Sequence, residues 1–237
     1  MTWYREWFGE EYLDLYAHRG EEEARAHVAF FRAQFGRIEG EILDLACGRG
    51  RHIREFRAAG YRITGCDLSW VLLRHGLAEL GPMPLVGADM RRLPFRDGSF
   101  GGLVNFFTSF GYFEEEEENL RTVKEMARVM TKAAPWVFDY LNVTRELGRL
   151  VEREERPTEG GKVLIERWFD ITSRTFNKRI TIGERHFLER VKGYDLDEIT
   201  AIFAAGGMAI RRAFGDFDGA PYTLDSPRLI LVGTRGR

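Results

Sequence analysis

Cysteine is scarce in the 237-residue sequence, which contains only Cys47 and Cys66. Two cysteines make no disulfide framework and no zinc cluster, so we expect both to be reduced and no metal to be bound. No apolar run approaches the ~20 residues that cross a membrane, and the first residues lack the basic region and apolar core of a signal peptide. A formal net charge of −2 gives no electrostatic footprint for nucleic acid or an anionic membrane. We therefore expect a cytoplasmic protein that binds neither.

Length and pattern together indicate one domain over residues 1–237, 44% of which are hydrophobic. We expect residues 1–35 to form an N-terminal helical cap. In residues 150–192 apolar and polar residues alternate, as in an antiparallel ribbon with polar turns, whereas the preceding chain alternates strands with helices. The sequence therefore predicts an α/β fold, doubly wound, with an inserted antiparallel β ribbon.

The stretch Glu41–His52 is the most informative part of the sequence. A short apolar run around Asp44 is typical of a parallel strand buried on both faces, and Gly48 and Gly50 follow where the chain must turn sharply. The residues from Arg51 have a helical pattern that ends at a glycine. A glycine turn that leads into a helix presents free backbone N–H groups to a ligand, so the stretch predicts a nucleotide-type site.

A dinucleotide-binding turn needs a third glycine three residues after the second, and Ile53 occupies that place. Asp67 lies nineteen residues after Gly48, where such units place an acid on the ribose hydroxyls. Ser69 is then predicted to cap the next helix, residues 70–80, and the alternative role of Asp67 is as part of that cap. Asp89 and Met90 end the third predicted strand and suit adenine, because a carboxylate accepts from the exocyclic amine and a thioether covers a ring face.

Two further segments contain candidate site residues. Tyr12, Tyr16 and Arg19 precede a predicted helix over residues 21–35, and an arginine fork binds carboxylates in bidentate fashion. Asn105 lies near the carboxyl end of the fourth predicted strand, residues 100–107, where open α/β sheets bind ligands, whereas Phe106 and Phe107 suit the core. Thr108 and Tyr112 extend this set of pocket candidates. We expect Trp3 and Trp7 to be core residues.

These motifs resemble those of class I methyltransferases that depend on S-adenosylmethionine and modify small molecules, in particular bacterial amino-sugar N-methyltransferases. The resemblance lies in Leu43–Gly50, Asp67, Asp89–Met90, Asn105–Phe113, the spacing of Tyr12, Tyr16, Arg19 and Gly20, and Asp218–Arg228. The chain departs from the family at Lys132–Pro135, where the family has Pro-Gly-Gly. The resemblance implies a seven-stranded sheet, its last strand antiparallel, with S-adenosylmethionine across the carboxyl ends of strands one to four. The implied cofactor-binding residues are Tyr12, Tyr16, Arg19, Asp44, Ala46, Cys47, Gly48, Gly50, Asp67, Leu68, Asp89, Met90, Asn105 and Phe106.

The resemblance further implies transfer of a methyl group to N or O of a small-molecule acceptor. We expect Tyr16 to face the methyl group, His186 to accept a proton, and residues 150–192 to form a lid over the acceptor. Arg167, Arg174 and Lys178 of the ribbon are candidates to receive an acidic acceptor. Two alternatives share every cofactor motif: an RNA or protein methyltransferase, and a non-catalytic protein that binds S-adenosylmethionine. The ribbon alternatively forms a dimer contact, so the sequence leaves monomer and homodimer open.

Overall fold

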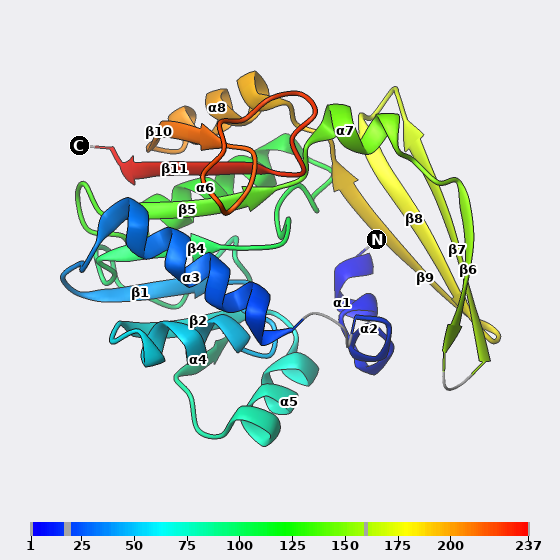
Figure 1. Cartoon of the computed structure of the whole chain (residues 1–237), viewed down its shortest axis with the longest axis horizontal. Coiled ribbons are helices and arrows are strands. Elements are labelled where there is room, and N and C mark those ends of the chain that lie inside the picture. Colours follow the sequence, from blue (N-terminus) through cyan, green and yellow to red (C-terminus); the bar gives the residue numbers. More distant parts are fainter. Residues whose placement is uncertain (1, 17–19, 159–160, 237) are drawn as a thin grey trace.

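We describe a computed structural model of the chain over residues 2–16, 20–158 and 161–236. Its main sheet has seven strands in the order β10-β11-β5-β4-β1-β2-β3 (Figure 1). The strands are β1 (Glu41–Leu45), β2 (Arg62–Asp67), β3 (Leu85–Gly87), β4 (Gly102–Asn105), β5 (Pro135–Tyr140), β10 (Met208–Phe214) and β11 (Leu229–Arg235). The first five pair in parallel, and β11 is antiparallel to both β5 and β10. The predicted doubly wound, mostly parallel fold is confirmed.

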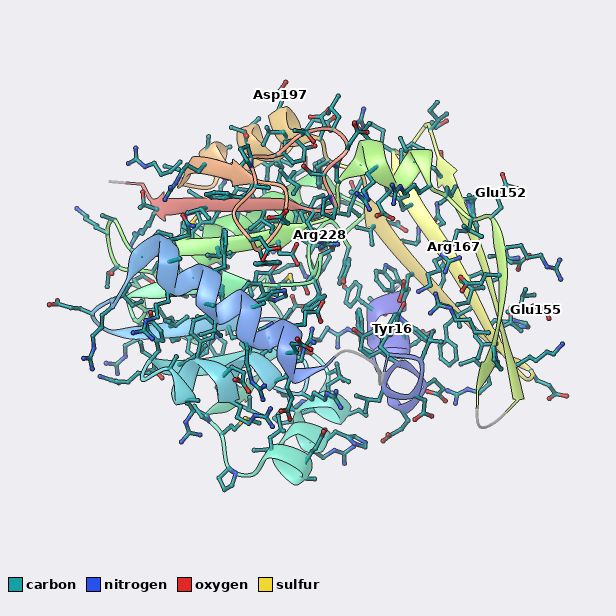
Figure 2. The ribbon with its side chains drawn as sticks, in the orientation of Figure 1. Tyr16, Glu152, Glu155, Arg167, Asp197 and Arg228 are labelled. Atoms are coloured by element: carbon teal, nitrogen blue, oxygen red, sulfur yellow. The ribbon has the colours of Figure 1, made fainter. Side chains whose placement is uncertain are left out.

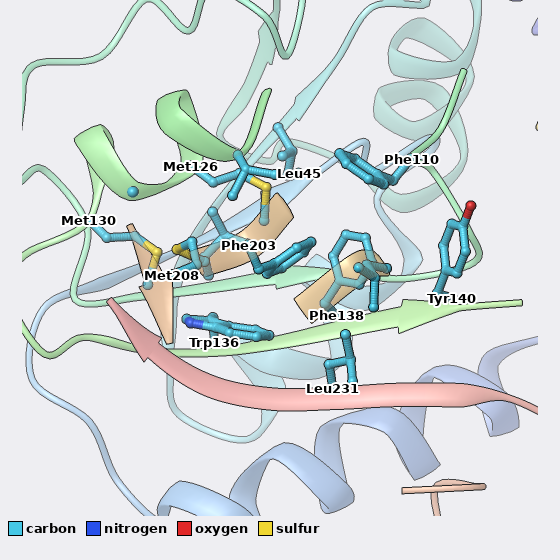
Figure 3. Packing of buried hydrophobic residues seen from close by; sticks show 14 of the residues in the cluster. Leu45, Phe110, Met126, Met130, Trp136, Phe138, Tyr140, Phe203, Met208 and Leu231 are labelled. Carbon is cyan, nitrogen blue, oxygen red and sulfur yellow. The ribbon is translucent and has the colours of Figure 1, made fainter. Parts of the chain in front are cut away.

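Helices cover both faces of this sheet, as buried parallel strands require. The helices are α3 (Glu21–Phe35), α4 (Arg51–Ala58), α5 (Trp70–Leu80), α6 (Glu116–Val129) and α8 (Leu196–Ala205). On one face, Trp136 and Phe138 of β5 pack against Phe203 of α8, with ring centroids 5.3 and 4.8 Å apart (Figure 3). On the other, Ile42 packs with Phe31 of α3 in a second cluster. Each such buried side chain contributes about 1.5–3 kcal/mol to folding.

A second sheet of four antiparallel strands follows β5, in the order β6-β7-β8-β9. Its strands are β6 (Arg153–Thr158), β7 (Gly161–Asp170), β8 (Thr175–Ile182) and β9 (Arg185–Lys192), and α7 (Val143–Gly148) precedes them. The sequence predicts β7, β8 and β9 but misses α7 and β6. The β6 segment has no apolar alternation, because Glu154 and Arg156 take the positions that face the other strands' apolar residues.

The N-terminal segment lies between the two sheets (Figure 1). It contains α1 (Trp3–Trp7) and α2 (Glu10–Leu15), and Trp3 and Trp7 are buried, as expected of core residues. They pack in one cluster with Val163, Ile165 and Phe187 of the second sheet. No helix within the described ranges is long and apolar enough to span a membrane.

Candidate functional site

A cavity opens at the carboxyl ends of β1, β2, β3 and β4, and the N-terminal segment covers it. Residues that follow each of the four strands line it, together with aromatic side chains from α1, α2 and the turn before α6. The lining includes Tyr4, Phe8, Tyr12, Tyr16, Asp44, Ala46, Cys47, Gly48, Arg51, His52, Asp67, Leu68, Ser69, Asp89, Met90, Phe106, Phe107, Ser109, Tyr112 and Phe113. Most of the predicted cofactor-binding residues are therefore brought together.

The turn after β1 presents its backbone to this cavity. Gly48 has a φ of 56°, and a Cβ added there would meet only Leu72, at 4.0 Å, so the backbone is open on that side. Ile53 occupies the position of the missing third glycine, and its side chain is accommodated by Gly65 of β2. A Cβ at Gly65 would lie 2.3 Å from Ile53 Cδ1. The close packing of helix on strand is thus achieved by a glycine in the strand instead of one in the helix.

Asp67 joins this turn to the end of β2. Its carboxylate accepts hydrogen bonds from Gly48 N and Ser69 N, both at 2.8 Å. Burial raises the pKa of Asp67, while the backbone N–H groups of Ser69 and Gly48 act in the opposite direction. Ser69 caps α5 by accepting from Leu72 N at 3.2 Å, as predicted. Each carboxylate oxygen has a further lone pair, so Asp67 holds the two turns and still faces the cavity as an acceptor.

Asp44 places a carboxylate beneath the turn with one oxygen unsatisfied. The residue is 1% exposed, and its Oδ2 has no hydrogen-bond partner among the described residues. Burial, with the nearby charge of Asp67, raises the pKa of Asp44 to about 8, although Arg51 opposes the shift. A buried, unpaired carboxylate at a cavity wall is suited to a cationic partner. The ammonium group of S-adenosylmethionine fits this requirement.

Asp89 lies at the opposite end of the cavity, after β3. Its Oδ1 accepts from the Arg91 backbone N and Nε, both at 3.0 Å, and its Oδ2 accepts from Arg91 Nη2 at 2.6 Å. Burial disfavours its charge, but the hydrogen bonds from Arg91 outweigh burial and hold the pKa of Asp89 below its ordinary value. The carboxylate is therefore ionised next to Met90, where an exocyclic amine would find an acceptor.

Tyr16 connects the cavity to the second sheet, and Figure 2 shows it beside α2, between the two sheets. Lys178 of β8 donates to the Tyr16 hydroxyl and, at 3.1 Å, to Glu189 of β9. Trp7 donates its indole N–H to the same Glu189 carboxylate. Burial lowers the pKa of Lys178, and Glu189 opposes that shift. The N-terminal segment is thus fastened to the insertion by a half-buried polar cluster.

Several predicted site residues lie elsewhere. Asn105 is buried under the cavity, where its Nδ2 donates to Leu45 O at 2.6 Å, and Gly50 caps α4 behind the turn. His186 is exposed and bonds to Thr181 at 3.1 Å, because the alternation of β9 directs its neighbour Phe187 inward. Neither Asn105, Gly50 nor His186 is among the lining residues. Arg19 lies outside the described residues.

The structure also brings in residues that sequence reasoning missed. Tyr4, Phe8 and Arg51 line the cavity, as does His52. His52 Nε2 lies 3.0 Å from Nδ1 of His27 on α3, and burial is the main cause that lowers the pKa of both imidazoles. The helical spacing of residues 21–35 places His27 on the apolar face of α3, which is a signal for its burial. Its pairing with a histidine on another helix has no sequence signal.

Comparison with known proteins agrees with this geometry. Residues 42–133 match the family described as "Methyltransferase domain". The protein YqeM of Bacillus subtilis, also named a methyltransferase, is 31% identical over 104 residues, 43% of this chain and 42% of that protein. The dTDP-3-amino-3,4,6-trideoxy-alpha-D-glucopyranose N,N-dimethyltransferase of Streptomyces venezuelae is 28% identical over 186 residues, 71% of this chain and 75% of that protein. The chain thus spans less than half of one relative and three quarters of the other.

Solved structures share the whole architecture. The CcbJ methyltransferase of Streptomyces caelestis superposes with a TM-score of 0.81 at 15% identity, covering 98% of each chain. The amino pentose methyltransferase CalS10 of Micromonospora echinaspora, solved with bound S-adenosylmethionine, has a TM-score of 0.70 at 21% identity, covering 95% of this chain and 97% of that one. At these identities the likeness shows the fold.

Residues 42–133 therefore match a methyltransferase domain, in a chain that has the fold of solved methyltransferases. The predicted resemblance to methyltransferases is confirmed, and one of the solved structures with this fold, CalS10, holds S-adenosylmethionine. Its relatives and structural neighbours include the N,N-dimethyltransferase named above, the amino pentose methyltransferase CalS10 and the sugar N-methyltransferase KedS8.

Proposed function

We propose that this protein transfers a methyl group from S-adenosylmethionine to N or O of a small-molecule acceptor. The observation that carries the proposal is the unsatisfied, buried carboxylate of Asp44, which faces the same cavity as Asp67. One acid is suited to the ammonium group of the donor and the other to its ribose hydroxyls. This pairing supports a donor with both groups, which a nicotinamide dinucleotide does not offer.

Each wall of the cavity has a role in holding the donor. Asp67 accepts from the ribose, Asp89 and Met90 receive adenine, and the open backbone at Gly48 lets the ligand approach closely. When bound, S-adenosylmethionine supplies a methyl group on a sulfonium that is already activated. The protein therefore has to bind, orient and exclude water, and such alignment supplies ~7–11 kcal/mol of a barrier. Tyr16 covers the cavity from the N-terminal segment, in keeping with a place next to the methyl group.

Nitrogen is the acceptor atom that we favour, because the relative aligned over three quarters of its length methylates an amino sugar. We propose that residues 1–35 cap the donor and that residues 150–192 form a lid over the acceptor. Lys178 contacts Tyr16, whereas Arg174 pairs with Glu198 at 2.9 Å on the side of α8. Lys178 thus remains a candidate for contact with the acceptor. Arg174 and the outward-facing His186 are no longer candidates for that contact.

Isotope-labelled S-adenosylmethionine incubated with the protein and a metabolite extract tests the proposal by mass spectrometry. We expect label in a small molecule, and an amino-sugar nucleotide panel is the first set of pure acceptors to try. Asp67→Ala is the matched negative control. Label found only in RNA or protein would refute a small-molecule acceptor and show an RNA or protein methyltransferase. Saturable donor binding without any labelled product would show a non-catalytic binding protein.

A further inference from the structure

The chain adopts a strained turn directly after β4. Phe107 and Thr108 both lie in the left-handed region, with φ values of 64° and 54°. An L-residue is disfavoured there by about tenfold relative to the right-handed region, and neither residue belongs to the types that tolerate it well. Two such residues in succession persist only where the surroundings hold them.

Asp139 of β5 and Arg228, which precedes β11, hold this turn. Asp139 Oδ2 accepts from Phe107 N at 2.8 Å, and the Asp139 carbonyl accepts from Thr108 N at 3.0 Å. Arg228 donates from Nε to Asp139 Oδ1 and from Nη2 to Thr108 Oγ1, both at 2.7 Å. Asp139 is 1% exposed, so this carboxylate has no competition from bulk water. We call these two residues the clamp.

The segment that precedes Arg228 is itself anchored. Asn142, which is fully buried, donates to the carbonyl oxygens of Thr223 at 3.1 Å and Ser226 at 2.8 Å. Its Oδ1 accepts from the Tyr222 hydroxyl at 3.1 Å. A fixed loop therefore places the guanidinium of Arg228, at the start of β11 (Figure 2), against the turn.

The turn faces the end of the cavity that lies away from Asp67 and Asp89. Phe107 and Ser109 line the cavity, and the guanidinium of Arg51 lies 4.2 Å from the centroid of the Phe107 ring. In the sheet order, β4 lies next to β5, away from the strands β2 and β3 that carry Asp67 and Asp89. The nucleoside acids thus occupy one end of the cavity, and the strained turn shapes the other.

We propose that Asp139 and Arg228 are positioning residues for methyl transfer, which hold the Phe107–Thr108 turn in the form that aligns the acceptor. The inference rests on the proposed function. Neither clamp residue lines the cavity, so both act through the turn. A displacement of about 1 Å in such a wall costs on the order of a hundredfold in rate.

Arg228→Ala tests the proposal directly. We expect kcat to fall ten- to hundredfold, the affinity for S-adenosylhomocysteine to stay within about twofold by calorimetry, and amide exchange at Phe107 to accelerate at least tenfold. Adding Thr108→Gly should recover about tenfold of the lost kcat, because glycine adopts the left-handed conformation freely. The control is Arg145→Ala, which removes an arginine that binds the same loop at Asp225 O, 2.9 Å away, without contacting the turn. It should leave all three quantities unchanged.

A purely structural role would lower the melting temperature without rescue by glycine, and that result would overturn the proposal. Unchanged kcat in Arg228→Ala would do so as well. Arg228→Lys, which keeps the charge but loses the fork, should give an intermediate kcat and serves if the alanine variant does not fold. If the wild-type protein methylates no acceptor, the proposed function fails; amide exchange then decides separately whether the clamp holds the turn, and unchanged exchange refutes it.

Discussion

The buried carboxylate of Asp44 predicts that donor binding releases a proton. With a pKa of about 8, raised first by burial and then by the charge of Asp67, Asp44 is about nine-tenths protonated at pH 7. A cationic ligand group favours the ionised form, so binding at pH 7 should release ~0.9 proton, and at pH 9 only ~0.1. The dissociation constant should therefore fall about tenfold between pH 7 and pH 9 on account of this group.

Calorimetry in buffers of different ionisation enthalpy counts the protons released. Asp44→Asn is the matched control, because it keeps the shape of the side chain, and the ratio of the two affinities cancels titration of the ligand's own amino group. In the Asp44→Asn variant, the free energy of unfolding should also lose the part of its pH dependence that comes from Asp44. A carboxyl whose folded pKa lies above its unfolded value stabilises the protein below about pH 4, and this contribution is lost as the pH rises towards 8. Equal proton counts in both proteins would refute the reasoning.

Three further predictions concern the donor and acceptor sides of the cavity. Asp67→Ala should weaken donor binding at least tenfold, since a hydrogen bond to a charged group contributes ~1.5–3 kcal/mol, and an unchanged calorimetric affinity would contradict the ribose role. Deletion of residues 1–20 should weaken donor binding while circular dichroism shows an intact sheet. Unchanged donor binding would show that this segment only packs against the rest of the protein. Replacing residues 150–192 with the insertion of a relative of known acceptor should transfer that preference and leave donor affinity within about twofold. A folded chimera that keeps its original acceptor and changes only its oligomeric state, measured by light scattering, would instead support an interface.

The features that the sequence predicted well are local ones. The strand and glycine turn at Glu41–His52, the cap at Ser69 and the position of Asp67 all depend on residues near one another in the chain. The departure from the family at Lys132–Pro135 is also local, since Ala133 itself adopts a φ of 59° where the family has a glycine.

The features that the sequence could not predict depend on distant partners. Asn105 was expected in the pocket because polar residues at strand ends face ligands, but its amide turns sideways to Leu45. The Phe107–Thr108 turn contains no glycine or asparagine to signal a left-handed conformation, which is held by Asp139 and by Arg228, 120 residues beyond Thr108. Such a conformation is determined by the assembled sheet.

The bond between Trp7 and Glu189 has a consequence for synthesis on the ribosome. Its partners are 182 residues apart, so α1 and α2 emerge long before the surface of β9 that fixes them. The strand ends at Asp44, Asp67 and Asp89 are complete much earlier, and Ser69 Oγ then already donates to Phe8 O at 2.6 Å, but the bond to Glu189 cannot form until the chain passes residue 189. A nascent chain thus acquires the acids of the cavity first and completes the fastening of its cover last, when about four fifths of the protein has been made.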